Sequence, residues 1–169
     1  MSVLVSDSSV LIDLERGALL ESAFRLPSGF VVPDVLYERE LKPYNGAQLI
    51  ALGLRVEGLG PDAVTCAQQY RRGCPALTTA DSFSLALALA RAWTLLTGDG
   101  ALRALAATER VDCHGLLWLL DQMEQEAVAS IRQLHEGLGI IVAHQRTRLP
   151  SDEVRARLSR YETALGVGP

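Results

Sequence analysis

The chain has 169 residues, of which 49% are hydrophobic and only 5% aromatic. This length can bury the core of one domain, and the composition favours a helix-rich α/β fold over a β-sandwich. The formal net charge of −4 argues against a protein held on nucleic acid by its overall charge, although a local basic face is compatible with it.

The cysteines and the apolar runs indicate the compartment. The three cysteines lack the spacing of a zinc site, and their odd number is typical of reduced cytosolic thiols. The longest apolar run, residues 85–96, is too short to span a bilayer and contains Arg91. Because the first residues also lack the basic region of a secretion signal, we expect a cytoplasmic protein with no membrane segment.

The first predicted element is a short strand, residues 3–5, which ends in a polar cluster. A helix is expected to begin near Val10, with Ser8 or Ser9 as its N-cap. Asp7 lies between strand and helix, and it is either a capping residue or a functional carboxylate.

A second predicted strand, residues 30–32, leads into a helix over residues 34–41. Pro33 stands at the start of this helix, where its missing N–H costs no hydrogen bond. Glu38 and Glu40 lie on the helix, where successive residues differ in direction by about 100°. At most one of the two glutamates can therefore face a site shared with the end of the first strand.

The middle of the chain alternates between strands and helices. Residues 54–59 predict an edge strand, residues 61–72 a helix and residues 94–97 a buried strand. Residues 82–93 predict an alanine-rich helix. Asp81 opens this helix, where the helix dipole favours a negative charge, so a stabilising role is the alternative to a functional one.

The buried strand stops abruptly at Thr97-Gly98-Asp99-Gly100, and a new helix is predicted over residues 101–107. Asp99 thus follows the carboxyl end of a strand, as Asp7 does. In open α/β sheets, ligands bind just outside the carboxyl ends of the strands. We therefore interpret both aspartates as candidates for one site.

The last third of the chain is predicted to be mainly helical. Residues 111–113 predict a short strand, and residues 116–136 a single long helix. Residues 138–141 form a segment broken by glycine. The final helix is expected to begin with Ser151 as its N-cap and to end at Gly166.

Arginines gather in this tail, with six of them between Arg132 and Arg160. They either cover a solvated helix face or contact the phosphate backbone of a nucleic acid. The three histidines lack metal-ligand spacing, so we expect no metal role for them. The candidate nucleic-acid contacts are Arg146, Arg148, Arg155 and Arg157.

The alternating elements predict an α/β fold with a central, mostly parallel sheet between helices. In such a fold four carboxylates would surround one cleft, those of Asp7, Glu38, Asp81 and Asp99. Carboxylates this close repel one another, and a divalent cation is the usual means of keeping them ionised. Oxygen ligands select Mg²⁺ or Mn²⁺ over zinc. With no nucleophilic triad in the sequence, the acids indicate metal-activated water that attacks a phosphodiester.

The motifs that carry a family resemblance are residues 5–13, Val32-Pro33 followed by Glu38, Thr79-Ala80-Asp81, and Leu95-Leu96-Thr97-Gly98-Asp99. In order and spacing they resemble the PIN domain family of metal-dependent ribonucleases, in particular the VapC-like toxins of bacteria and archaea. The resemblance implies a three-layer α/β/α fold with a core over residues 1–123. A helical C-terminal extension, residues 124–169, would pack on the same domain.

The resemblance also implies a role for each acid. Glu38 rather than Glu40 would complete the acidic pocket, because Glu38 follows Pro33 at the distance usual in the family. Ser8 or Thr97 would supply supporting hydroxyl contacts. The implied catalytic residues are Asp7, Glu38, Asp81 and Asp99, of which the three aspartates would bind Mg²⁺ or Mn²⁺.

The implied activity is endonucleolytic hydrolysis of RNA by the toxin of a toxin–antitoxin pair. A small antitoxin protein would mask the acidic cleft, and the toxin would form a homodimer. Residues 100–103 depart from the family pattern, because many members carry a further acid there. A second metal ion would therefore be weakly held.

Two other classes of function fit parts of the pattern. A catalytically inactive PIN-like module that binds nucleic acid or protein would keep the acids as helix caps and surface charge. A phospho-acceptor domain of receiver type also gathers aspartates at strand ends. Such a domain needs a lysine late in the sheet, whereas the only lysine of this chain is Lys42.

Overall fold

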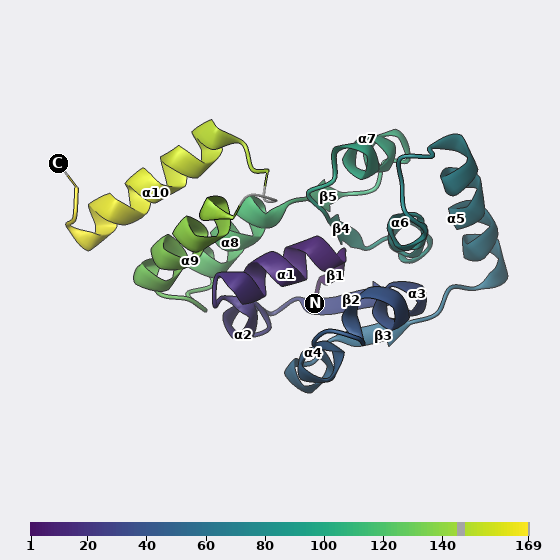
Figure 1. The fold of residues 1–169 in the computed structure, drawn as a ribbon, viewed down its shortest axis with the longest axis horizontal. Coiled ribbons are helices and arrows are strands. Elements are labelled where there is room, and N and C mark those ends of the chain that lie inside the picture. The colour runs from purple at the N-terminus through teal and green to yellow at the C-terminus, as the bar shows by residue number, and fades with distance from the viewer. Residues whose placement is uncertain (145–147, 169) are drawn as a thin grey trace. The chain divides into compact units, whose positions relative to one another are not determined.

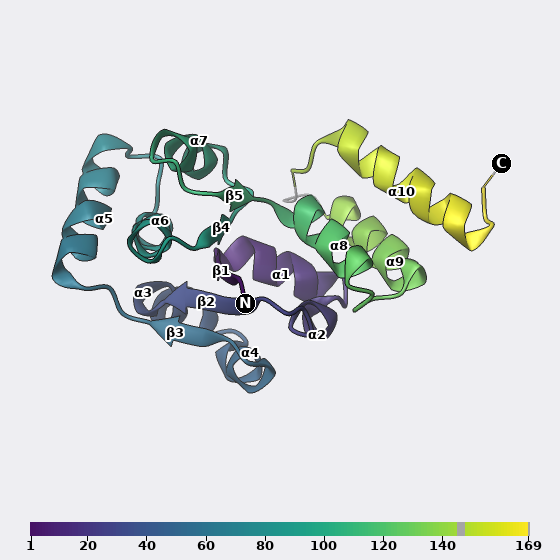
Figure 2. The ribbon, with the colours of Figure 1, turned by 180° about the vertical axis from the view of Figure 1, so that it is seen from behind.

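We describe a computed structural model, which covers residues 1–144 and 148–168. The chain divides into two compact units. Unit 1 comprises residues 1–10 and 27–114, and unit 2 comprises residues 11–26 and 115–169. Figure 1 shows their elements, and Figure 2 shows the same ribbon from behind.

Unit 1 is built on a five-stranded sheet in which every pair of neighbouring strands is parallel. The order is β3-β2-β1-β4-β5, so β1 is central (Figure 1). This confirms the predicted α/β class. The strands are β1 (Val3–Ser6), β2 (Gly29–Pro33), β3 (Arg55–Glu57), β4 (Thr94–Leu96) and β5 (Cys113–His114).

The position of each strand follows from its residues. Leu4 and Val5 of β1 are buried although they point to opposite faces, as expected for a central strand covered on both sides. In β3, Arg55 and Val56 are exposed, which is tolerable because β3 lies at the edge of the sheet.

The strand order creates a switch point beside β1. The chain first adds β2 and β3 on one side of β1, and then returns to place β4 and β5 on the other. Ser6 of β1 pairs with Leu96 of β4, and the amide of Asp7 donates to the carbonyl of Leu96 at 3.0 Å. Crevices at such points are the usual ligand sites of doubly wound sheets. Asp7 and Thr97 lie at the switch point beside β1.

Helix α6 (Thr79–Arg91) is the main helical support of the sheet in unit 1. It contacts β1, β2 and β4, and α5 (Pro61–Gly73) packs against it. Small side chains such as Ala86 and Ala88 are fully covered and allow close approach to the sheet. The other helical elements of unit 1 are α3 (Asp34–Leu36), the π-helical turn η1 (Tyr37–Leu41), α4 (Gly46–Leu52) and α7 (Gly100–Thr108).

Unit 2 is helical in the part that the structure describes. Its elements are α1 (Ser8–Arg16), which begins in unit 1, α2 (Leu20–Ala23), α8 (Leu116–Gln125), α9 (Ile131–Ala143) and α10 (Ser151–Leu165). The final helix ends at Gly166 in a left-handed conformation, as predicted.

The prediction of one helix over residues 116–136 is wrong. The helix ends at Gln125, and Ala127 adopts a left-handed conformation with φ of 52°. Ser130 and Gln133 then form a capping box that starts α9. The predicted break at residues 138–141 is also wrong, because these residues lie inside α9.

A glycine pair allows close packing within unit 2. A Cβ atom at Gly137 of α9 would lie 2.6 Å from Cδ1 of Leu19 and 2.7 Å from the carbonyl oxygen of Gly17. Neither distance is compatible with a side chain in the present packing. Gly137 therefore has a steric role in joining α9 to the segment after α1.

No helix among the described residues is long and apolar enough to cross a membrane.

Candidate active site

Asp7 is the centre of the candidate site. It follows β1, and its Oδ1 accepts hydrogen bonds from Oγ of Ser9 at 2.8 Å and from the amide of Val10 at 3.0 Å. Its Oδ2 accepts a bond of 2.5 Å from Oγ1 of Thr97. The aspartate thus caps α1 itself, in place of the predicted Ser8 or Ser9. Capping and a role in the site are compatible, because the two oxygens make different contacts.

Asp7 is only 5% exposed. Burial raises its pKa above the usual 3.8, the hydrogen bonds from Thr97, Val10 and Ser9 lower it, and the charge of Asp81 raises it further. The influence of Asp81 means that the two carboxylates lie within electrostatic reach of each other. A nearby cation would favour the ionised form of Asp7.

Thr97 connects the ends of β1 and β4. Its buried hydroxyl donates to Asp7 and accepts a hydrogen bond of 3.1 Å from the amide of Asp99. Oδ1 of Asp99 caps α7 by accepting from the amide of Leu102 at 2.8 Å. The structure therefore links Asp7, Thr97 and Asp99 in one hydrogen-bonded chain.

Asp81 lies in the first turn of α6. Its Oδ2 accepts a hydrogen bond of 2.8 Å from the amide of Thr78, and the hydroxyl of Thr78 accepts one from the amide of Asp81. This capping box fixes the aspartate at the start of the helix. The same residue is the one whose charge raises the pKa of Asp7.

The structure places the two glutamates of η1 differently. Glu38 is 57% exposed at its side chain and pairs with Lys42 at 2.7 Å. Glu40 accepts a hydrogen bond from the hydroxyl of Ser8, the neighbour of Asp7. The sequence favoured Glu38, yet Glu40 is the one linked to the start of α1.

Both glutamates lie in a π-helical turn. The amide of Lys42 bonds to the carbonyl of Tyr37, five residues earlier, at 2.8 Å. A helix of regular α geometry was expected over residues 34–41, whereas π-turns are rarer and are frequent at functional sites.

The donor chemistry suits a hard cation, because the candidate ligands are carboxylate and hydroxyl oxygens. Each aspartate uses one or both oxygens for the hydrogen bonds above. Among the described residues, no group of three or more His, Cys, Asp or Glu side chains is already arranged to hold a metal ion. Binding a cation would therefore require these side chains to draw together.

Sequence reasoning gave Arg103 no functional role. This residue lies on α7, one turn after Asp99, and its Nη1 donates to the carbonyl oxygen of Thr97 at 3.2 Å. The spacing of four residues on a predicted helix could have placed it beside the site.

The tail arginines have different environments. The side chain of Arg157 is 14% exposed and binds both oxygens of Asp121, from Nε at 2.9 Å and from Nη2 at 2.5 Å. This pairing raises the pKa of Arg157. Arg148 is exposed, the side chain of Arg155 is 79% exposed, and Arg146 lies outside the described residues.

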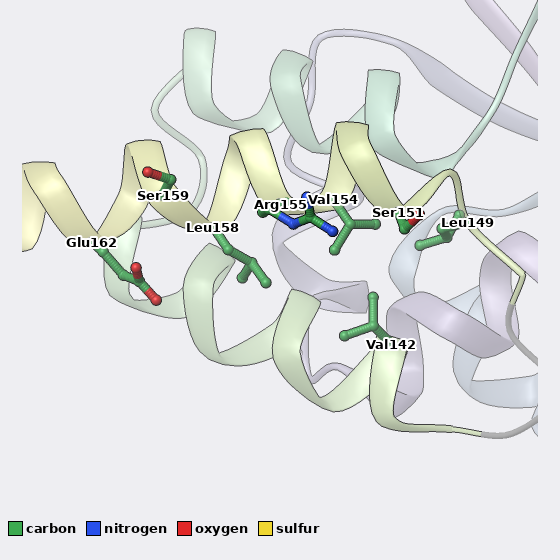
Figure 3. A pocket seen from close by; sticks show the side chains of 8 residues that line it. All are labelled: Val142, Leu149, Ser151, Val154, Arg155, Leu158, Ser159 and Glu162. Carbon is green, nitrogen blue, oxygen red and sulfur yellow. The ribbon is translucent and has the colours of Figure 1, made fainter. Parts of the chain in front are cut away.

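Arg155 also lines a groove of about 670 Å³ within unit 2, between α9 and α10. Figure 3 shows apolar side chains of both helices pointing into the space between them. The lining includes Val142, Leu149, Val154, Leu158 and, at the polar end, Glu162.

Comparison with known proteins identifies the family. A family model described as a PIN domain, DUF3368, matches residues 3–163. A search of curated proteins found no match. Among solved structures, the chain is similar to a PilT N-terminus domain protein from the hyperthermophilic archaeon Sulfolobus solfataricus P2. The TM-score is 0.50 at 14% identity, over 73% of this chain and 93% of that one.

The structural similarity confirms the expected PIN-like α/β/α fold. The family match extends through α10, so it includes the tail that the sequence motifs did not cover. The division into a core over residues 1–123 and an extension over residues 124–169 stays a prediction. The chain belongs to the DUF3368 family of PIN domains, a fold generally found in nucleases that use divalent metal ions.

Proposed function

We propose that the protein is a metal-dependent endoribonuclease and the toxin of a toxin–antitoxin pair. The observation that carries the proposal is the hydrogen-bonded chain from Asp7 through Thr97 to Asp99 at the switch point of the sheet. A buried carboxylate there is costly unless it has a function or a partner. Membership of the PIN family supplies the class of reaction.

The residues proposed to hold Mg²⁺ or Mn²⁺ are Asp7, Asp81 and Asp99. We propose Glu40 as the fourth acid in place of Glu38, because Ser8 orients Glu40 whereas Lys42 holds Glu38. When bound, the cation lowers the pKa of a coordinated water and neutralises charge that develops on the phosphate.

The protein's own side chains prepare this site in defined ways. The hydroxyl of Thr97 donates to the carboxylate of Asp7, and the amide of Leu102 donates to that of Asp99. These bonds set the orientation from which the two carboxylates would draw together on a cation. The hydroxyl of Ser8 does the same for Glu40.

The partners proposed from the family resemblance are an RNA substrate, a small antitoxin and a second copy of the chain. An antitoxin would mask the acidic site, and a basic side chain such as arginine is the group that an acidic pocket would accept. Co-expression followed by size-exclusion chromatography tests both protein partners.

A second candidate is a PIN-like binding module without catalysis. It is favoured by the capping bonds of Asp7, Asp81 and Asp99, because these bonds alone would justify an aspartate at each position. Thermal unfolding separates the candidates. A metal site predicts a higher Tm in Mg²⁺ or Mn²⁺ that is lost in Asp99→Asn, whereas the module predicts no metal-dependent change.

Cleavage of a labelled single-stranded RNA tests the proposal itself. We expect internal cleavage in Mg²⁺ or Mn²⁺, none in a chelator, and a loss of at least about 100-fold in Asp99→Asn. Asp62→Asn is a matched control, since Asp62 is an exposed aspartate at the start of α5. Metal-independent cleavage, or equal rates in both variants, would refute the proposed site.

A further inference from the structure

Arg103 is a cation next to the acids of the candidate site. Its Nη1 donates to the carbonyl oxygen of Thr97, the residue whose hydroxyl binds Asp7. Burial raises the pKa of the thiol of Cys113, the first residue of β5, while the charge of Arg103 lowers it and the charges of Asp112 and Asp7 raise it. The charges of Arg103 and Asp7 thus both reach this thiol, and the hydrogen bond to Thr97 places Arg103 beside the end of β4.

The guanidinium of Arg103 has no carboxylate partner within 4.0 Å among the residues that the structure describes. In contrast, Arg157 and Arg160 of unit 2 both bind Asp121. Arg103 is exposed, and its one hydrogen bond to a carbonyl uses a single donor of the five on a guanidinium. The remaining donors are available to a ligand.

Charge explains why such a group would be needed. Three or four carboxylates exceed the charge of a single divalent cation, so the loaded site would still repel a phosphodiester. A second cation would relieve this repulsion, but residues 100–102 supply no further acid to hold one. A guanidinium group compensates the same negative charge and needs no carboxylates to hold it in place. Its planar N–H groups can also donate to two oxygens of a phosphate at once.

We propose that Arg103 binds the non-bridging oxygens of the scissile phosphate. The proposal rests on the proposed ribonuclease function, which it extends by naming the residue that contacts the phosphate. Arg103 is then a substrate-binding catalytic residue, and its hydrogen bond to the carbonyl of Thr97 holds the guanidinium beside that residue.

The test compares Arg103→Ala and Arg103→Lys with Arg71→Ala. Arg71 is a matched control, because it is also an exposed arginine on a helix of unit 1 and donates to a backbone carbonyl, that of Pro75. We expect Arg103→Ala to lower kcat on single-stranded RNA by about 10²- to 10³-fold in Mg²⁺. Arg103→Lys should retain part of the rate, and Arg71→Ala all of it.

Two further measurements separate substrate binding from a structural role. Guanidinium chloride at a non-denaturing concentration should restore part of the rate of Arg103→Ala and leave that of Arg71→Ala unchanged. The increase in Tm on adding Mn²⁺ without RNA should be as large in Arg103→Ala as in the wild type, because removing a positive charge does not weaken cation binding.

The possible results lead to different conclusions. If Arg103→Ala cleaves as fast as Arg71→Ala, the inference is wrong and the nuclease function stands. If Arg103→Ala loses the Mn²⁺-dependent stabilisation together with cleavage, and guanidinium restores nothing, the residue only supports the fold and the inference is again wrong. If the wild type shows no metal-dependent cleavage, the proposed function fails, and the role of Arg103 fails with it.

Discussion

The hydroxyl of Thr97 donates a hydrogen bond of 2.5 Å to Oδ2 of Asp7, and the two residues are 90 positions apart in the sequence. The contact exists because β1 and β4 are parallel neighbours that end at the same edge of the sheet. Thr97 thus orients Oδ2 of Asp7, while Ser9 and Val10 hold Oδ1.

Replacing this threonine with an isosteric apolar residue should therefore weaken the protein and its site. We expect Thr97→Val to lower the free energy of unfolding by about 1–3 kcal/mol, because a buried carboxylate oxygen loses its donor. Urea unfolding at neutral pH measures the change. Thr108→Val is the control, since Thr108 is exposed and donates only to the carbonyl of Ala104. Equal effects in the two variants would mean that the Thr97 bond is unimportant.

The raised pKa of Asp7 predicts the pH dependence of stability. The folded state holds the proton on Asp7 more tightly than the unfolded state, whose pKa is near 3.8. Stability contributed by this group is therefore present at low pH and is lost as pH rises from about 3.8 through the higher folded-state pKa.

Asp7→Asn removes this titration. Without divalent cations, the wild type should lose stability relative to Asp7→Asn as the pH rises above 3.8. Adding Mn²⁺ at neutral pH should stabilise the wild type and leave Asp7→Asn unchanged. Denaturant midpoints for both proteins across the pH range measure the difference. A stability difference that stays constant with pH would contradict the assigned shift.

The contrast between Glu40 and Glu38 gives a prediction about the metal site. Glu40→Gln should reduce the increase in Tm caused by Mn²⁺, because Ser8 holds this carboxylate near Asp7. Glu38→Gln should leave that increase unchanged and cost less than about 1 kcal/mol, since it removes only an exposed ion pair with Lys42. The opposite result would restore Glu38 as the fourth acid.

The packing of Gly137 gives a prediction for unit 2 with an internal control on the same helix. Gly137→Ala should lower the free energy of unfolding by about 1–3 kcal/mol, because its Cβ would meet Leu19 and the backbone of Gly17. Gly139→Ala should instead stabilise by up to about 1 kcal/mol, because nothing lies within 4 Å of its Cβ position. Chemical denaturation distinguishes these opposite signs.

The paired and exposed arginines of α10 should also behave differently. Arg157→Ala should lower the free energy of unfolding by about 1–3 kcal/mol, because Asp121 loses the guanidinium that donates to both of its carboxylate oxygens. Arg155→Ala should change stability little, and it should weaken RNA binding with a smaller salt dependence if the tail contacts phosphates. Anisotropy of a labelled RNA at several salt concentrations measures this. Unchanged affinity would make Arg155 structurally and functionally neutral.

The sequence was informative where one local signal decided the structure. The apolar runs before Asp7 and Asp99 predicted parallel strands, and β1 and β4 are parallel neighbours in the sheet. Gly166 was an equally clear signal for the end of the last helix, because the left-handed conformation at that position favours glycine.

Other features depend on tertiary contacts or lack a distinctive residue. The helix after Gln125 ends with alanine in a left-handed conformation at position 127, so no glycine or proline marked the break. The capping box of Ser130 and Gln133 was visible in the sequence and was overlooked. The π-turn that contains Glu38 and Glu40 has no sequence signature, and the different contacts of the two glutamates are visible only in the structure.

The role of Asp7 as the centre of the active site is decided by the rate of RNA cleavage in Mg²⁺ or Mn²⁺, measured for the wild type, Asp7→Asn and Asp62→Asn. We expect Asp7→Asn to remain folded and to cleave at least about 100-fold more slowly, and Asp62→Asn to cleave like the wild type. Metal-dependent cleavage that persists in Asp7→Asn would contradict an active site built around this carboxylate.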